Sequence, residues 1–261
     1  MNNLITIDIG NTNIDIGYFL NEHLLSTAKI STQDNKSEFE IGSSIKSLLN
    51  IKNESLKNLD IIICSVVPNK THVVAKASKI ITDKEPIILN HNFEFPISNK
   101  YHPPEDVGID RIVDSIAAVK LYGAPSIILD IGTCLVFNAI TEKKEYIGGS
   151  ILPGLYMAAE SLASSTALLK PVDLKIPENI IGRNSSESIQ SGIIFGYIEI
   201  IKGFFKIYKE NISKNKEIKL IITGGGADLI TPNLDIDFIY NENLSFIGLK
   251  YIYELLKNNK R

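Results

Sequence analysis

Short apolar runs alternate with amphipathic helical patterns along the first half of this 261-residue chain. Buried-strand patterns cover residues 4–7, 14–19, 23–30 and 60–67, with a shorter one at 87–89. Ser37 followed by Glu40 forms a capping-box pattern and predicts that a helix begins there. Further helical periodicity covers residues 71–81 and the stretch that begins at 109. The first half is therefore predicted to have the order βββαβαβα.

The second half repeats this order. Strand patterns cover residues 126–129, 135–140, 145–151, 219–222 and 238–240, and helical patterns cover 155–162, 186–208 and 244–256. Each half opens with a strand that ends in Asp-Ile-Gly, at Asp8 and at Asp130, and 130 − 8 = 122 residues separate the two. We predict a duplicated α/β fold with two mixed-sheet domains, residues 1–115 and 116–261, and an active site in the cleft between them.

Composition excludes several classes of protein. Lys and Arg number 27 and Asp and Glu number 30, so a net charge of −3 gives no general attraction to nucleic acid or to an anionic membrane. No apolar run reaches the roughly 18 residues that a membrane span needs. The two cysteines, Cys64 and Cys134, form neither a metal-binding spacing nor a disulfide framework. The start, Met-Asn-Asn-Leu at residues 1–4, has no basic region followed by an apolar signal core, so we expect a cytoplasmic protein with no nucleic-acid or membrane partner.

The segment Asp-Ile-Gly-Asn-Thr-Asn at residues 8–13 is a candidate phosphate-binding loop. Gly10 allows backbone N–H groups to approach an anion, and Asp8 can reach a hydrated Mg²⁺ that bridges phosphates. A plain hairpin turn uses the same residue types, so the segment alone does not decide. The partial repeat of this motif at Asp130-Ile-Gly-Thr133 favours phosphate binding, because two such loops can clamp a nucleoside triphosphate and its metal.

Two further loops carry candidate chemistry. The glycines at 224–226 follow a strand and suit the adenosine end of a nucleotide, although an ordinary loop also explains them. In the segment from Tyr101 to Arg111, two prolines stiffen the approach to a helix that begins near Asp110. Asp110 can be a base for a substrate hydroxyl beside an anion-binding Arg111, or both can simply suit the first helical turn. The spacing leaves these two explanations open.

Ser185 stands at the start of the long predicted helix, in Gly-Arg-Asn-Ser. The free N–H groups of that helix end could meet an anion, and the structural alternative is that Ser185 caps the helix. The four histidines form no metal or nucleophile cluster in the sequence, so a Ser-His-Asp hydrolase has little support.

These segments, in this order, resemble the type III pantothenate kinases, which belong to the actin-like ATPase superfamily with ribonuclease H-like domains. The resemblance extends from Asp8 to the turn at 224–225, and its most specific stretch is Tyr101 to Arg111. It implies transfer of the ATP γ-phosphate to pantothenate, the first step of coenzyme A biosynthesis. It also implies Mg²⁺, a monovalent cation (K⁺ or NH₄⁺) and a cytoplasmic homodimer.

The resemblance assigns roles to individual residues. Asp110 would be the proton acceptor, and Asp130 would bind the monovalent cation. The expected ATP-binding residues are Asp8, Ile9, Gly10, Asn11, Thr12, Asn13, Ile14, Asp15 and Thr133. The expected pantothenate-binding residues are Tyr101, Gly108, Ile109, Asp110, Arg111 and Ser185.

Two positions depart from the family pattern. Ser185 replaces the usual Thr and keeps the hydroxyl, and Cys134 replaces a small Ala, so we expect binding to weaken little. Three alternatives remain from other classes. They are a non-enzymatic transcriptional accessory factor, an actin-like kinase for another small acceptor, and a filament-forming protein. The Asp110–Arg111 pair and the lack of a basic DNA-reading element count against the first.

Overall fold

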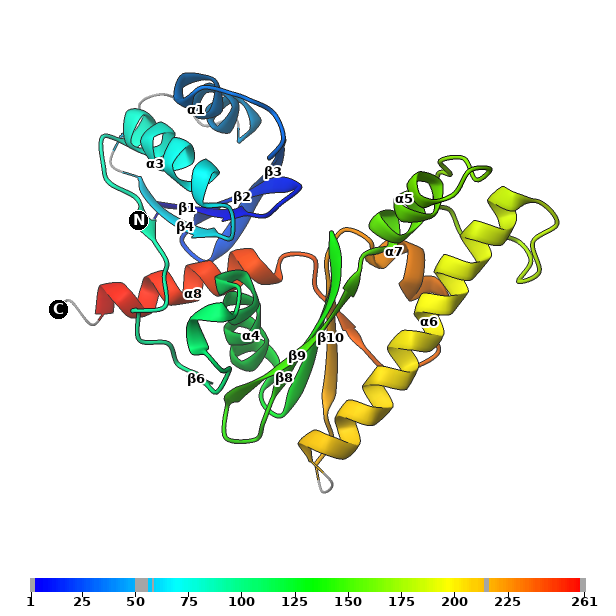
Figure 1. Cartoon of the computed structure of the whole chain (residues 1–261). Helices are drawn as coiled ribbons and strands as arrows, with labels where there is room; N and C mark the ends of the chain where they lie inside the picture. Colours follow the sequence, from blue (N-terminus) through cyan, green and yellow to red (C-terminus); the bar gives the residue numbers. More distant parts are fainter. Residues whose placement is uncertain (1–2, 50–55, 58, 214–215, 259–261) are drawn as a thin grey trace. The chain divides into compact units, whose positions relative to one another are not determined.

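The computed structural model describes residues 3–49, 56–57, 59–213 and 216–258 (Figure 1). Two compact units divide the chain. The first contains residues 1–96, 102–117 and 243–261, and the second contains residues 97–101 and 118–242. The predicted domains, 1–115 and 116–261, place the C-terminal helix in the second domain. The structure instead places that helix in the first unit.

The first unit is built on a five-stranded mixed sheet. Its strands lie in the order β3-β2-β1-β4-β5, where β1 is antiparallel to β2 and parallel to β4. The strands are β1 (Asn3–Ile9), β2 (Asn13–Leu20), β3 (His23–Ser31), β4 (Asp60–Ser65) and β5 (Ile87–Ile88). The helices are α1 (Glu38–Leu48), α3 (Pro68–Thr82), α4 (Ile109–Tyr122) and α8 (Leu244–Asn258), with a 3₁₀ turn at Pro104–Asp106. Helix α4 belongs to this unit only as far as residue 117.

The two faces of this sheet carry different residues. Ile5, Ile7 and Ile9 of β1 are fully buried in a core to which α1 and α3 contribute Ile45 and Val74. Because side chains alternate along a strand, Thr6 and Asp8 lie on the opposite face. On that face, Phe246 of α8 packs against Gly17, so closely that a methyl group on Gly17 would lie 3.0 Å from its ring. Figure 1 shows α1 and α3 on one side of β1–β4 and α8 on the other.

The second unit repeats the plan with a six-stranded mixed sheet in the order β11-β10-β7-β8-β9-β6. The strands are β6 (Ser98–Asn99), β7 (Ser126–Ile131), β8 (Cys134–Ile140), β9 (Glu145–Pro153), β10 (Lys219–Thr223) and β11 (Ile239–Tyr240). The helices are α5 (Leu155–Ser165), α6 (Ser185–Ile212) and α7 (Ala227–Ile230), with a 3₁₀ turn at Thr231–Asn233. Ile127, Leu129 and Ile131 of β7 form one core with Ile194 and Ile198 of α6.

The predicted mixed-sheet duplication is confirmed, and so is the capping box. The Ser37 N–H donates to Glu40 Oε2 at 2.8 Å, and the Glu40 N–H donates to Ser37 Oγ at 3.4 Å. The two-residue strand β6 was not predicted, since two residues are too short to show any alternation. In the part of the chain that the structure describes, no helix combines the length and the apolar character that crossing a bilayer requires.

Asp60 fastens α8 to the start of β4. Its carboxylate accepts hydrogen bonds from Lys84 at 2.8 Å, from Lys257 at 2.6 Å, and from the hydroxyl of the buried Tyr253. Burial acts against the charged form, but the hydrogen bonds from Lys257, Lys84 and Tyr253 together lower the pKa of Asp60 to about 2. The C-terminal helix is thereby joined to a strand 193 residues earlier in the chain.

We expect Asp60→Ala to lower the free energy of unfolding by about 1–3 kcal/mol, because a buried tyrosine hydroxyl and two ammonium groups lose their acceptor. Since the folded pKa lies below the ordinary 3.8, the wild-type contribution is present above pH 4 and is lost as the pH falls through about 2. Urea denaturation of both proteins at pH 7 and at pH 3 measures the difference. Equal midpoints at pH 7 would contradict the prediction.

Candidate functional site

The predicted first phosphate loop is the short connection between β1 and β2. The Gly10 N–H donates to the Asn13 carbonyl at 2.9 Å, which closes the turn. Asn11 and Thr12 are exposed at its tip. The loop is held from outside by Thr32, which follows β3 and was not singled out by the sequence: its hydroxyl donates to the Gly10 carbonyl at 2.8 Å. The exposed residues Asn11 and Thr12 therefore follow a glycine whose N–H and carbonyl are both held by hydrogen bonds.

Asp8 and Asp15 lie side by side where the first two strands meet this loop. They are direct cross-strand partners in the antiparallel β1–β2 ladder, so both side chains are on the face away from α1 and α3. Lys29 of β3 forms an ion pair with Asp15 at 3.2 Å. Burial raises the pKa of Asp15, and the charge of Lys29 opposes that rise. On the β4 side of Asp8, the cross-strand partner is Cys64, across the parallel β1–β4 ladder.

Cys64 is the centre of an acidic cluster in the first unit. Its thiol is fully buried and hydrogen-bonds to the Asp8 carboxylate. Burial, together with the charges of Asp8, Asp110 and Asp114, raises the pKa of this thiol well above its ordinary value. Asp114 is itself buried and accepts a hydrogen bond from Ser245 of α8 at 2.8 Å. The predicted residues Asp8 and Asp110 therefore both act on the pKa of one buried thiol.

The carboxyl group of Asp110 is fixed at the start of α4. Oδ1 accepts a hydrogen bond from the Arg111 N–H at 2.8 Å, and a Cβ atom on Gly108 would overlap this oxygen. Only glycine at 108 allows the carboxylate to lie there. Burial raises the pKa of Asp110, while the Arg111 N–H and the Arg111 guanidinium act in the opposite direction. A carboxylate with a raised pKa is a better proton acceptor than an ordinary aspartate.

In the second unit, Asp130 ends β7 within a tight arrangement of glycines. Gly224 has a φ of +94°, and a Cβ atom there would overlap Asp130 Oδ1 and lie 2.6 Å from the Ile131 carbonyl. The Gly226 N–H donates to that carbonyl at 2.8 Å. Gly154, at the start of α5, approaches Thr133 so closely that a Cβ atom would lie 2.7 Å from the Thr133 carbonyl carbon. The second loop is therefore fixed by the glycines of two neighbouring turns.

Tyr101 lies on the same unit as this second loop. Its ring packs over Gly148 of β9, where an added Cβ atom would be 3.5 Å away, and its centroid is 6.2 Å from that of Tyr146. The Tyr101 N–H donates to Asn99 Oδ1 at 2.9 Å. Gly148 has a φ of +114°, a conformation that glycine adopts readily and side chains rarely adopt.

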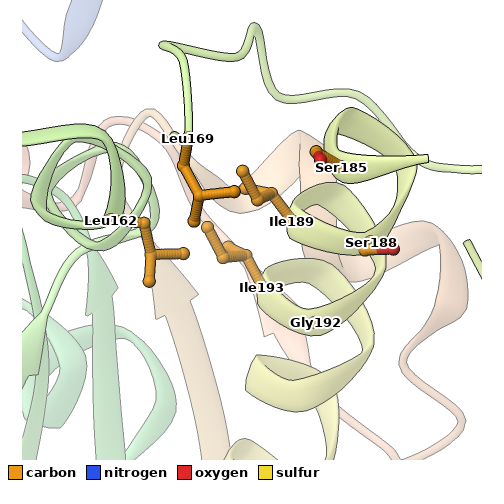
Figure 2. Close-up of a pocket in the computed structure, with 7 residues that line it drawn as sticks. All are labelled: Leu162, Leu169, Ser185, Ser188, Ile189, Gly192 and Ile193. Carbon is orange, nitrogen blue, oxygen red and sulfur yellow. The ribbon is translucent and has the colours of Figure 1, made fainter. Parts of the chain in front are cut away.

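Ser185 lines an apolar pocket of about 490 Å³ at the N-terminus of α6. Figure 2 shows the side chains of Leu162, Leu169, Ile189 and Ile193 turned toward one another beside it. The structural alternative for Ser185, that it caps this helix, is wrong. Asn184 is the N-cap and accepts a hydrogen bond from the Glu187 N–H at 3.0 Å, because its amide side chain reaches that donor from outside the helix.

The structure thus sorts the predicted site residues into two sets. Asp8 to Asp15 and Gly108 to Arg111 belong to the first unit, and Tyr101, Asp130, Thr133 and Ser185 belong to the second. Among the residues that the structure describes, no three His, Cys, Asp or Glu side chains are grouped to hold a metal ion. A Mg²⁺ ion that is held mainly by phosphates needs only one or two carboxylates, and Asp8 suits that requirement.

A family model described as type III pantothenate kinase matches residues 4–207. The chain belongs to the type III pantothenate kinase family. A curated type III pantothenate kinase from Finegoldia magna is 38% identical over 260 residues, covering 98% of each chain. The predicted family and the predicted enzyme class, a pantothenate kinase, are confirmed.

Two solved structures agree with the predicted fold. MreB5 of Spiroplasma citri bound to AMPPNP aligns with a TM-score of 0.55 at 12% identity, covering 99% of this chain and 98% of that chain. A candidate Baf family transcriptional activator from Campylobacter jejuni aligns with a TM-score of 0.59 at 21% identity, covering 97% and 99%. At these identities the similarity is one of fold, and it confirms the actin-like architecture. The family match favours the kinase over the transcriptional accessory factor.

Proposed function

We propose that the chain transfers the γ-phosphate of ATP to the primary hydroxyl of pantothenate, giving 4′-phosphopantothenate, with Asp110 as the proton acceptor. One observation carries the assignment of the base. The Asp110 carboxylate lies against Gly108 at the start of α4, held by the Arg111 N–H, and burial raises its pKa. A fixed carboxylate of raised pKa suits a group that must take a proton from an alcohol.

The two predicted loops supply the remaining roles. Asn11, Thr12 and Asn13 bind the ATP phosphates, chiefly through the N–H groups of Asn11 and Asn13, with Thr133 as a contact from the second loop. Tyr101, Gly108, Ile109, Arg111 and Ser185 bind pantothenate, and Arg111 can pair with its carboxylate. Phosphoryl transfer passes through a loose transition state, so these groups act chiefly by positioning the two substrates and by balancing charge.

Two ions complete the proposal. Mg²⁺ beside Asp8 would neutralise charge on the phosphates, and oxygen donors suit this ion. Asp130 would bind K⁺ or NH₄⁺, which calls for an oxygen ligand held in place, and the carboxylate is confined by Gly132 and Gly224. We further propose a cytoplasmic homodimer. The strongly exposed apolar side chains Leu168, Ile180 and Ile181 support a protein–protein contact on the second unit.

The test is ADP release by the purified protein with ATP, Mg²⁺ and pantothenate, in K⁺ and in Na⁺ buffers. We expect turnover that requires pantothenate and that rises in K⁺. In Asp130→Asn we expect the K⁺ response to weaken, because the proposed ligand loses its charge. ADP release that does not depend on pantothenate, or that is faster with a sugar acceptor, would favour the alternative actin-like kinase.

A further inference from the structure

Thr32 lies outside every motif of the sequence, yet it touches the first phosphate loop at both ends. It directly follows β3, where Ser31 pairs with Asn13. Its N–H donates to the Thr12 carbonyl at 2.9 Å, and its hydroxyl donates to the Gly10 carbonyl at 2.8 Å. The residue is only 4% exposed. One buried residue therefore binds two carbonyls of a three-residue turn, one through its side-chain hydroxyl and one through its backbone N–H.

These two contacts determine where the loop's N–H groups point. A trans peptide group is planar, and its N–H points away from its carbonyl. In the described chain the cis peptides are His102–Pro103 and Ala124–Pro125, so the loop peptides are trans. With the Gly10 carbonyl turned toward Thr32, the Asn11 N–H points the opposite way. The same holds for the Thr12 carbonyl and the Asn13 N–H.

We infer that Thr32 is a positioning residue for ATP: it orients the Asn11 and Asn13 N–H groups toward the phosphates by holding the carbonyls of Gly10 and Thr12. Successive N–H groups that face one side of a turn form an anion-binding concavity. An untethered glycine turn would have to be ordered when ATP binds, which lowers affinity. The inference rests on the proposed function, because it requires that this loop bind ATP.

The test compares Thr32→Val with Thr32→Ser. Valine keeps the shape and the backbone N–H but removes the hydroxyl, and serine keeps the hydroxyl. We expect Thr32→Val to raise the KM and the Kd for Mg-ATP about tenfold, the effect expected when one buried hydrogen bond that orients a binding group is lost. The KM for pantothenate should stay within about twofold, and Thr32→Ser should restore ATP binding to within about threefold of wild type.

Thr82 provides a matched control in the same unit. Its hydroxyl is also buried and donates to a carbonyl, that of Ser78, at the same 2.8 Å, but it lies at the end of α3. We expect Thr82→Val to lose stability as Thr32→Val does, without a change in ATP affinity. If Thr32→Val binds ATP as wild type does, or if both valine variants lose affinity equally, the positioning role is overturned.

Measuring ATP affinity by calorimetry separates this inference from the proposed reaction. A wild-type protein that binds ATP but does not phosphorylate pantothenate would overturn the proposed function, and the Kd values would still decide the role of Thr32. A wild-type protein that does not bind ATP would overturn both. An ATP affinity that falls in Thr32→Val alone, and returns in Thr32→Ser, supports the inference.

Discussion

Asp110→Asn is expected to lower kcat by about 10²–10⁴-fold, the usual contribution of a general base. Asparagine has nearly the same shape, and its carbonyl oxygen can still accept the hydrogen bond from the Arg111 N–H that Asp110 accepts at 2.8 Å. What the variant loses is the ability to take a proton. The KM values should change much less than kcat, because the loop around residue 110 keeps its structure.

The pH dependence gives this prediction a second readout. Burial raises the pKa of Asp110 above its ordinary 3.8, so at acid pH the carboxyl is protonated and cannot accept a proton. The wild-type kcat/KM should therefore rise with pH along a limb whose midpoint lies above 3.8. That limb should be absent in Asp110→Asn. Steady-state rates between pH 4.5 and 8 would show the difference.

Stability should move in the direction opposite to activity. A raised carboxyl pKa means that the folded state binds the proton more tightly than the unfolded state does. The contribution of Asp110 to stability is thus present below pH 3.8 and falls as the pH rises through the raised pKa. At pH 7 the charge of Asp110 opposes folding, so the urea midpoint of Asp110→Asn should equal or exceed that of wild type. The Asp110→Asn variant is thus expected to lose activity while it remains folded.

Asp106 is the matched control for this experiment. It is an exposed aspartate of the 3₁₀ turn that precedes α4, so Asp106→Asn removes the same charge from a neighbouring position. Its kcat should stay within about twofold of wild type, as expected for an exposed surface substitution. Near-full turnover by Asp110→Asn would remove Asp110 from the role of base and would leave Asp8 and Asp114 of the same cluster as the candidate bases.

The sequence predicts most of the fold because its signals are local. The apolar runs of both halves and the Ser37 capping box each depend on neighbouring residues, and the structure has strands and a helix at those places. The unit to which α8 belongs depends on distant contacts. The apolar face of α8 indicates that this helix is buried, but it does not indicate which element covers it. Only the structure shows that Gly248 of α8 packs against Val113 of α4.

The candidate site divides in the same way. Asp8, Asp110 and Asp130 stand in recognisable motifs, so the sequence names them. Thr32 and Cys64 stand in ordinary strand contexts, and their importance comes from sheet register: one lies opposite Thr12 and the other pairs with Asp8. Strand order and register would have to be known before either residue could be chosen. A polar residue that directly continues a strand beside a glycine turn is the only local signal for Thr32.

Gly224→Ala is expected to lower the free energy of unfolding by about 2–4 kcal/mol, from backbone strain and overpacking together. Gly224 has a φ of +94°, which side chains rarely adopt, and the new methyl group would lie 2.6 Å from the Ile131 carbonyl. It would also overlap Asp130 Oδ1, so that carboxylate has to move. The chain contains no Trp, so unfolding is best followed by circular dichroism.

The neighbouring Gly225 separates this strain from a general effect of alanine in the turn. A Cβ atom there has nothing within 4 Å, so Gly225→Ala should change the unfolding midpoint little. Because Gly224→Ala displaces the proposed cation ligand Asp130, the K⁺ concentration for half-maximal turnover should also rise in that variant, by about tenfold for a lost charged contact. Equal unfolding midpoints for the two variants would show that the left-handed turn does not hold Asp130. A midpoint that falls with an unchanged K⁺ response would leave the turn structural and remove Asp130 from cation binding.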